Sequence, residues 1–538
     1  MEREDQYDAI IIGAGLNGLT IGNTLAYNGY KTIIIDKNTQ PGGYVQNFYR
    51  EEFRFDVSTQ YLFGCGPDGI VTNILKTFGA ENLHEFKPVE NILHWKDTQN
   101  NYECKPPVAI DEFTEFIAKE FPEDEKNWRK FDKKYGGLMD KLLTMMDVEG
   151  KLRKVGWAFK NLGSLMKVAV GIFRSSKGTL NKKFKNPALR ELLHNTITAF
   201  GISMEESSFL LWCLAELSYH RGGAWYPTGG GGAFSASLGE HFQKNGGELL
   251  LNHTVTSINV KKEGFRKKIA DVVTCRDKKG NEKKFTGKIV VNACDIETLA
   301  KELVPEGTFK KRWIKRVSTR DTMDSMFCVY LGLDIDVRDY GVDTQDIWHI
   351  HPQNRTPEIR EKIDYQFDYS VLPKDIITVY NNSPDDTACP PGESVISIYV
   401  TTKYDGWEGL LEDGKKGPKY KETKEKCGWQ LVDRLAKIIN IPDLRDHVKV
   451  MVCATPLTLK RFSGAKNGTP LGYRWTKKNL LPPMMWGTNV KNLYVTGQLT
   501  FPCGGMPVVM LTGSLVAKGI LKKLKKMKEK EAKQREKK

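Results

Sequence analysis

The sequence contains no Cys-x-x-Cys motif, and its ten cysteines are scattered along the chain. Disulfide frameworks and structural zinc sites need cysteines at short, regular spacings, so neither is expected. The nine histidines show no ligand spacing either. The closest pair, His349 and His351, is typical of one face of a strand. We therefore expect no metal site.

A long apolar run is also missing. No stretch approaches the roughly eighteen continuous apolar residues that a membrane-spanning helix needs. Residues 1–7 are polar and acidic, which is not typical of a signal peptide. The expectation is a cytoplasmic protein, and peripheral association with a membrane is left open.

Positive charge is gathered near one end of a chain whose net charge is +15. Residues 518–538 hold eleven Lys or Arg against three Glu. Because this tail lacks aromatic side chains that could stack on bases, a nucleic-acid partner is not expected. An anionic membrane surface and a simple solvated helix end both remain open as interpretations.

Residues 136–173 form a second basic segment, in which apolar side chains are interspersed with Lys and Arg. This composition fits a helix in a lipid interface and an amphipathic core helix about equally well. Gly156, Gly163 and Gly171 are expected to break the segment into shorter helices, since glycine is a poor helix former.

The first apolar run leads directly into a Gly-x-Gly-x-x-Gly motif made by Gly13, Gly15 and Gly18. A helix-length segment and a second apolar run follow, and this run ends at Asp36. In such a unit the glycines allow a sharp turn, a close approach to a pyrophosphate and tight helix packing. The helix N-terminus favours phosphate, and the acid binds a ribose. The segment therefore predicts a dinucleotide-binding unit, and an unrelated Gly-rich turn is the alternative.

The continuation favours FAD over NAD. Gly42 and Gly43 follow Asp36 at the spacing of an extended FAD signature, so the chain resembles flavin-dependent amine oxidases, phytoene desaturases and their relatives. The resemblance implies that this second glycine pair runs beside the phosphates and ribityl chain of FAD. That family usually carries Arg or a small residue after the pair, whereas this chain has Tyr44.

A later signature narrows the resemblance. Residues 492–498 and 501–507 are similar to the C-terminal flavin motif of phytoene desaturases, carotenoid isomerases and retinol saturases. The resemblance implies that a strand delivers Gly497 beside the ribityl chain, with Gln498 in place of an acid, and that Gly505 keeps a turn slim against the flavin ring. Further segments resemble the same group, namely residues 53–61, 223–230 and 454–469.

We expect an α/β fold, in which a Rossmann-like FAD-binding domain carries an inserted α+β substrate lobe. Helices are predicted at residues 110–120, 123–146 and 186–200, and strands at 327–331 and 395–400. The expected divisions are a first part of the FAD-binding domain (1–95), a helical insertion for substrate or membrane association (96–225), a second FAD-binding part (226–300), a substrate-binding β-sheet lobe (301–480), a C-terminal FAD-binding part (481–521) and a basic tail (522–538).

The residues expected to bind FAD are Gly13, Ala14, Gly15, Asn17, Gly18, Asp36, Lys37, Gly42, Gly43, Tyr44, Gln60, Val255, Gly497, Gln498, Gly505 and Met506. In the resembled family the backbone at the position of Val255 contacts the adenine, although a buried strand residue would also explain it. Hydride transfer to a flavin needs placement of the substrate and exclusion of water more than catalytic side chains. His220 and Arg221 are the candidates for a catalytic role, and a surface pair at a domain junction is the alternative.

The resemblance implies an FAD-dependent oxidoreductase that desaturates, saturates or isomerises carbon–carbon double bonds of a hydrophobic isoprenoid, carotenoid, retinoid or other unsaturated lipid. It also implies an external electron donor or acceptor, because no second Gly-x-Gly-x-x-Gly unit follows a strand. The direction of electron flow stays open. Two alternatives remain, a flavin amine oxidase and a non-catalytic escort that uses the fold to bind lipid or protein.

Overall fold

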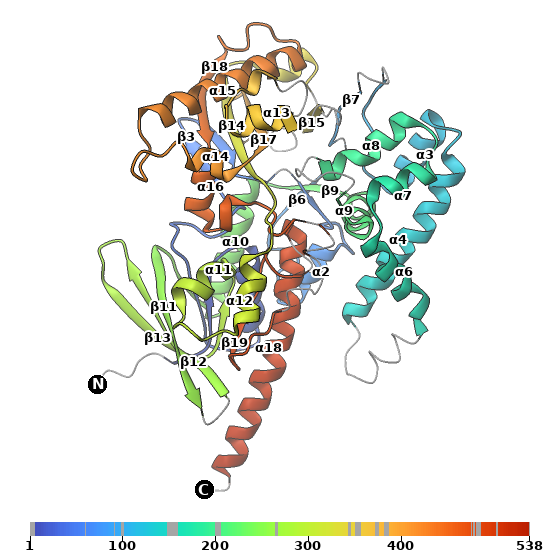
Figure 1. The fold of residues 1–538 in the computed structure, drawn as a ribbon. Coiled ribbons are helices and arrows are strands. Elements are labelled where there is room, and N and C mark those ends of the chain that lie inside the picture. Colours follow the sequence, from blue (N-terminus) through green and yellow to red (C-terminus); the bar gives the residue numbers. More distant parts are fainter. Residues whose placement is uncertain are drawn as a thin grey trace.

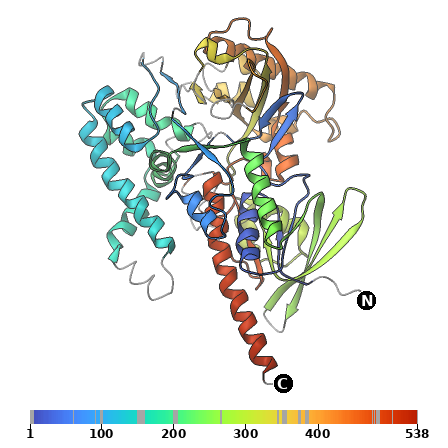
Figure 2. The same cartoon turned by 180° about the vertical axis from the view of Figure 1, so that it is seen from behind.

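In the computed structural model the chain forms a central layered sheet, a second sheet and a group of helices beside them (Figure 1). The structure describes residues 6–59, 61–90, 92–97, 102–147, 160–198, 206–263, 267–342, 346–349, 357–371, 376–380, 387–474, 476, 479, 486–501 and 504–536. Figure 2 shows that the group of helices, coloured cyan to teal, stands apart from the central sheet when seen from behind as well.

The central sheet has the strand order β10-β2-β1-β13-β12-β11, with β19 paired to β13. Strands β10, β2, β1, β13 and β19 are parallel, whereas β12 and β11 are antiparallel. Their bounds are β1 (Gln6–Ile12), β2 (Thr32–Ile35), β10 (Glu248–Leu250), β11 (His253–Glu263), β12 (Lys267–Asp277), β13 (Glu282–Asn292) and β19 (Leu493–Val495). The expected α/β fold with a Rossmann-like parallel sheet is confirmed.

Both faces of this sheet are covered, which explains why β1 and β2 are apolar runs without alternation. Ala9 and Ile11 belong to a core shared with one set of helices, and Ile10 and Ile12 belong to a second core on the opposite face. The first set is α1 (Leu16–Tyr27), α2 (Ile70–Lys76), α10 (Gly230–Lys244) and α18 (Met506–Arg535). The opposite core is closed by β11, β12, α11 (Ile296–Thr298) and α12 (Lys311–Ser318).

The second sheet has the order β15-β16-β17-β14-β18. One of its faces packs against α13 (Pro357–Asp364), α14 (Tyr404–Glu408) and α15 (Pro418–Ile439). The other face meets the hairpin β3 (Asn47–Arg50) and β4 (Phe53–Asp56), where the Tyr330 ring contacts Phe48 at 5.0 Å. The strands are β14 (Ser325–Leu333), β15 (Asp346–His349), β16 (Ile376–Tyr380), β17 (Ser394–Thr402) and β18 (Val448–Ala454), followed by α16 (Pro456–Ser463). The predicted strands at 327–331 and 395–400 are therefore confirmed within β14 and β17.

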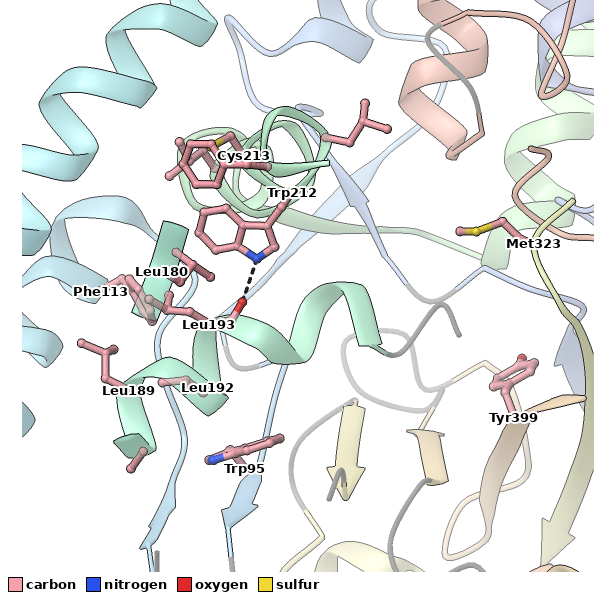
Figure 3. Packing of buried hydrophobic residues seen from close by; sticks show 14 of the residues in the cluster. Trp95, Phe113, Leu180, Leu189, Leu192, Leu193, Trp212, Cys213, Met323 and Tyr399 are labelled. Carbon is pink, nitrogen blue, oxygen red and sulfur yellow. Dashed lines mark hydrogen bonds between the residues drawn. The ribbon is translucent and has the colours of Figure 1, made fainter. Parts of the chain in front are cut away.

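The helical group is built around Trp212, which is fully buried and donates its indole N–H to the Leu193 carbonyl at 2.8 Å (Figure 3). Its helices are α3 (Ile110–Glu120), α4 (Glu125–Asp147), α6 (Leu162–Phe173), α7 (Ser176–Lys183), α8 (Pro187–Thr198) and α9 (Phe209–Gly222). The predicted helices correspond to α3, α4 and α8, and the last two residues predicted for α8 lie outside the described part. Short strands join this group to the rest: β5 (Leu62–Phe63), β6 (Phe86–Val89), β7 (Trp95–Asp97), β8 (Tyr102–Cys104) and β9 (Ala224–Pro227).

One expectation about this group is wrong. Gly163 and Gly171 do not break the chain, because α6 runs through both positions. A Cβ atom at Gly171 would lie 3.5 Å from the Leu210 Cβ atom at the start of α9, which is ordinary van der Waals contact, and one at Gly163 would meet nothing within 4 Å. The helix penalty of glycine, roughly 1 kcal/mol per residue, is too small to end the helix at these positions. Gly156 lies outside the described residues. Within the described chain, no helix combines the length and the hydropathy that a membrane span needs.

Candidate functional site

The parallel strands bring distant segments to one edge of the central sheet. Leu250, Ile35, Ile12, Asn292 and Val495 are neighbours in one row of the ladder, and each of them ends its strand. In open α/β sheets, ligands bind outside this carboxyl edge. The residues that leave the edge side by side are Leu251, Asp36, Gly13, Ala293 and Thr496.

The glycine turn after β1 has the geometry expected of a phosphate-binding turn. Gly13 has a φ of +108°, a backbone conformation that residues with a Cβ atom rarely adopt. A Cβ atom at Gly18 would lie 2.0 Å from the Gly13 carbonyl oxygen, so the helix packs tightly on this turn. At Gly15 the situation differs, because the nearest atom to a Cβ position is the Gly42 oxygen at 4.0 Å. The backbone at Gly15 therefore faces open space at the N-terminus of α1, where a phosphate gains from the free N–H groups.

Asp36 holds this turn directly. One carboxylate oxygen accepts a hydrogen bond from the Ala14 amide at 2.7 Å, and the other accepts from the Asn38 amide at 2.8 Å. The Asp36 carbonyl oxygen accepts from the His253 amide at 2.9 Å, which brings the start of β11, and with it Val255, to the end of β2. The structure thus gathers Ala14, Asp36 and Val255 as expected for one end of a dinucleotide.

The second glycine pair lies against the first motif. The Gly42 amide donates to the Ala14 carbonyl at 2.8 Å, and a Cβ atom at Gly43 would lie 3.4 Å from the Gly15 Cα atom. Both glycines have positive φ, so the chain turns tightly here. The Lys37 ammonium points elsewhere, since it donates to the Arg461 carbonyl at the end of α16 at 2.7 Å. Burial lowers the pKa of Lys37.

The C-terminal flavin motif of residues 492–498 and 501–507, called the closing motif below, begins at the same edge. Gly497 follows β19 by two residues, and Gly505 precedes α18. Helices α18 and α1 pack closely, since the Asn17 side-chain amide donates to the Val509 carbonyl at 2.8 Å and a Cβ atom at Gly513 would lie 2.8 Å from the Asn17 carbonyl oxygen. The structure therefore brings Asn17 and Gly18 together with the first turns of α18, which begin at Met506.

Tyr44 and Gln498 make contacts that the sequence did not predict. The hydroxyl of the half-buried Tyr44 is placed to donate to the Gly468 and Thr469 carbonyls at 3.0 and 3.1 Å, and the Gln498 side-chain amide donates to the Thr469 carbonyl at 3.1 Å. Burial raises the pKa of Tyr44, so its hydroxyl keeps its proton at ordinary pH. The side-chain nitrogen of Gln498 is therefore bonded to the protein's own backbone.

The two candidate catalytic residues lie within the helical group. The His220 ring donates from Nδ1 to the Val108 carbonyl at 2.7 Å, stacks on Phe113 with ring centres 3.9 Å apart, and its Nε2 lies 3.5 Å from the Glu216 carboxylate. Arg221 forms an ion pair with Asp132 at 2.9 Å. These contacts join α9 to α3 and α4, and none of them reaches the carboxyl edge. Gln60, which was also expected to bind the cofactor, lies outside the described residues.

Sequence reasoning missed a buried carboxylate, that of Asp56. It accepts a hydrogen bond from the Tyr226 hydroxyl at 2.5 Å and another from the Gly231 amide at 2.9 Å, so it caps the N-terminus of α10. Burial, and then the Asp56 charge, raise the pKa of Tyr226 well above its usual range. A Cβ atom at Gly231 or Gly232 would lie within 2.1 or 2.7 Å of Thr59 or Asn47. The glycine run at the start of α10 therefore packs around the Asp56 carboxylate at the end of β4. The run of glycines was the sequence feature that could have indicated this contact.

Unpaired polar atoms mark the edge as well. Asn17 Oδ1, Asn292 Oδ1 and Thr496 Oγ1 are buried and have no hydrogen-bond partner within the described part of the chain. They lie at the start of α1 and just at the ends of β13 and β19. Buried polar atoms are seldom left unpaired. The two amide oxygens can only accept, so they fit hydroxyl groups of a dinucleotide, whereas the Thr496 hydroxyl can donate to a phosphate or accept from a hydroxyl. Among the described residues, no group of His, Cys, Asp and Glu could hold a metal ion.

Comparison with known proteins agrees with this geometry. A model of the family described as flavin-containing amine oxidoreductase matches residues 16–521. Prolycopene isomerase 2 of an Oncidium hybrid cultivar is 26% identical over 537 residues, which cover 96% of this chain and 84% of that protein. The all-trans-retinol 13,14-reductase of Danio rerio is 25% identical over 546 residues, which cover 96% and 86%. A 4,4'-diapophytoene desaturase of Methylomonas is 23% identical and covers 96% and 95%.

Solved structures share the fold. An oxidoreductase from Methanosarcina mazei superposes with a TM-score of 0.60 at 15% identity, covering 95% of this chain and 99% of that one. Wild-type putrescine oxidase bound to putrescine superposes with a TM-score of 0.59 at 12% identity, covering 96% and 99%. At such low identity the likeness concerns the fold alone.

Proposed function

The chain belongs to the family of flavin-containing amine oxidoreductases, and from this membership we propose that it binds FAD and acts on carbon–carbon double bonds of a hydrophobic isoprenoid or retinoid polyene. The observation that carries the proposal is the alignment of the chain, over 96% of its length, with relatives named as an isomerase, a reductase and a desaturase of such compounds. The fit of the carboxyl edge to a dinucleotide supports the choice of cofactor.

In this proposal each segment at the carboxyl edge binds a different part of FAD. Gly15 and the N-terminus of α1 take the pyrophosphate, and Asp36 takes the adenosine ribose. Val255 lies at the adenine end, because β11 starts beside Asp36. Gly43 and Gly497 run along the ribityl chain, where the bulk of a side chain would interfere.

The chain's own residues mainly place the substrate and exclude water. When bound, FAD supplies the acceptor or donor of a hydride. An aromatic cluster on the second sheet helps to fix the site, since the Tyr330 hydroxyl donates to the Val57 carbonyl at 2.9 Å. Val57 leads to Thr59, whose hydroxyl lies 4.0 Å from the Met506 sulfur. The start of α18 is thus connected to the second sheet through Thr59 and Val57.

The test is an anaerobic spectrum of the purified protein with its flavin oxidised or chemically reduced. Retinoids, carotenoid precursors and unsaturated fatty acids are added to each form, and saturated analogues and putrescine serve as controls. Reoxidation of the reduced flavin by a polyene identifies a saturase, bleaching of the oxidised flavin a desaturase, and a change of the polyene without net flavin change an isomerase. Bleaching by amines alone would contradict the proposal. The first two outcomes imply an external electron carrier.

A membrane surface is proposed as the source of the polyene. On α6 the side chains of Met166, Val170 and Phe173 are 62%, 46% and 59% exposed and recur at helical spacing. Arg174 and Lys177 are exposed beside them. Apolar residues with neighbouring cations fit an anionic lipid interface. In both views α6 and the basic second half of α18 extend toward the same side of the molecule (Figures 1 and 2).

A further inference from the structure

Two hydrogen-bond donors from distant motifs meet at one buried carbonyl. Tyr44, directly after the second glycine pair, shares its hydroxyl proton between the Thr469 oxygen at 3.1 Å and the neighbouring Gly468 oxygen at 3.0 Å. Gln498, directly after Gly497, donates to the same Thr469 oxygen at 3.1 Å. Thr469 is fully buried. One backbone acceptor therefore joins both flavin motifs, although Tyr44 and Gln498 are separated by almost the whole chain.

The acceptor lies in the segment 463–473, which we call the clamp loop. Its far side is fixed to the start of β14, because the Ser325 hydroxyl donates to the Gly468 carbonyl at 2.9 Å and the Met323 amide donates to the Gly472 carbonyl at 2.8 Å. Positive φ values at Asn467, Gly468 and Gly472 fold the loop back on itself. The loop is thus held by hydrogen bonds on two sides.

The clamp loop also touches the closing motif by backbone contact. A Cβ atom at Gly472 would lie 2.0 Å from the Gln498 carbonyl oxygen, and one at Gly504 would lie 2.4 Å from the Leu471 carbonyl oxygen. At its other end the Lys466 amide donates to Asp295 at 3.0 Å, just after β13. The clamp loop therefore contacts both the segment that follows β13 and the segment that follows β19.

We propose that Tyr44 and Gln498 are positioning residues that act as a pair, fixing the clamp loop so that the Gly42–Gly43 turn and the Gly497 turn keep one spacing around the flavin. The inference rests on the proposed flavin function. A tyrosine and a glutamine can both donate to a carbonyl. A carboxylate at position 498 would instead place a hydrogen-bond acceptor next to the Thr469 carbonyl oxygen, which is also an acceptor. The two departures from the resembled sequence pattern thus share one partner.

The first test uses the full chain without flavin. Hydrogen exchange is measured at the Gly468 and Thr469 amides, which donate within the clamp loop to Ala465 and Lys466, in Y44F, Q498E and the double variant. Each single change leaves the Thr469 carbonyl one donor, so exchange should rise about 2- to 12-fold. The double change leaves none, and its effect should exceed the product of the two. Unchanged exchange, or a double effect equal to that product, would overturn the pairing.

A matched control is Y404F, since the Tyr404 hydroxyl accepts from Lys460 on α16 at 3.1 Å, outside the clamp loop. It should leave exchange at Gly468 unchanged. If Y404F accelerates exchange there as much as Y44F, the effect reports general loosening and the pairing is overturned.

The second test asks for positioning and needs no substrate. FAD is loaded, and its release rate and visible spectrum are compared in the wild type, Y44F, Q498E and the double variant. Faster release with a shifted flavin band, at unchanged thermal stability of the flavin-free protein, supports positioning. Identical release rates and spectra overturn it. If the wild type takes up no FAD, the proposed function fails, yet the exchange test still decides whether the two residues share the carbonyl.

Discussion

The amide of Ala14 donates a hydrogen bond of 2.7 Å to the carboxylate of Asp36, so the acid that follows β2 holds the glycine turn that follows β1. Both groups lie at the carboxyl edge, and the second carboxylate oxygen is bonded to the Asn38 amide. Asp36 therefore shapes the turn, and in the proposed function it also binds the adenosine ribose. An acid at this position has a structural task even in the absence of a nucleotide.

Replacing Asp36 by alanine should accordingly weaken the protein and the cofactor complex together. Two charge-assisted hydrogen bonds to backbone amides are lost, which should cost about 2–4 kcal/mol in the free energy of unfolding without FAD. Urea unfolding of the flavin-free protein measures this. D36N keeps the shape and one acceptor and should cost less. A D36A protein as stable as the wild type would show that the observed hydrogen bonds contribute nothing.

Gly15 and Gly18 should respond differently to a side chain. At Gly15 a Cβ atom meets nothing closer than 4.0 Å, so G15V should fold with nearly unchanged stability and lose at least about tenfold in FAD affinity. At Gly18 the Cβ atom would lie 2.0 Å from the Gly13 oxygen, so G18A should destabilise the protein by about 1–3 kcal/mol even without FAD.

Thermal unfolding and FAD titration of the same two variants separate these outcomes. G519A is a matched control, because Gly519 lies in α18 with nothing near its Cβ position. It should bind FAD like the wild type. Full FAD affinity in G15V would contradict the placement of the pyrophosphate.

The stability of the protein should depend on pH through His241. Burial lowers the pKa of this histidine, whose Nδ1 lies 2.8 Å from the Asn23 side-chain oxygen. Between the lowered folded pKa and the unfolded value near 6.5, the unfolded chain binds more protons, so stability falls as the pH drops below about 6.5. In urea unfolding at pH 7.5 and 5.5, H241Q should lose less stability on acidification than the wild type.

His447 offers the opposite case on the surface. Its hydrogen bond to Asp334 at 2.8 Å raises its pKa, so its stabilisation is complete below about pH 6.5 and is lost as the pH rises through the folded pKa. H447Q should therefore change the pH dependence with the opposite sign. Equal slopes for H241Q and H447Q would refute both assignments.

Membrane association should depend on the exposed face of α6. M166D/F173D removes apolar contacts and adds negative charge, and each buried side chain of this size is worth roughly 1.5–3 kcal/mol. Retention on vesicles with anionic lipid should therefore fall by about tenfold or more. Cosedimentation at low and high salt measures it. Y49D is the control, because Tyr49 is 62% exposed on β3, away from α6. Equal losses in both variants would count against α6.

The local parts of the fold were predictable because their signals are local. A glycine motif and two apolar runs of strand length on either side of a helix-length segment specify β1, α1 and β2. Packing partners far apart in sequence carry no such signal. The sequence next to Gly171 does not indicate that Leu210 lies against it. Likewise, the sequence next to Asp56 does not indicate that the glycine run at the start of α10 encloses this carboxylate. The same holds for Tyr44 and Gln498, whose common acceptor is a main-chain atom.

The pairing of β19 with β13 has a consequence for folding during translation. A chain leaves the ribosome N-terminus first, so β1 and its glycine turn are exposed long before β19 is translated. Until then residues 290–292 of β13 lack their partner strand, and an unpaired strand edge is a template for pairing with other chains. A chain truncated before residue 493 should therefore aggregate more readily than the full chain, because this edge is never covered.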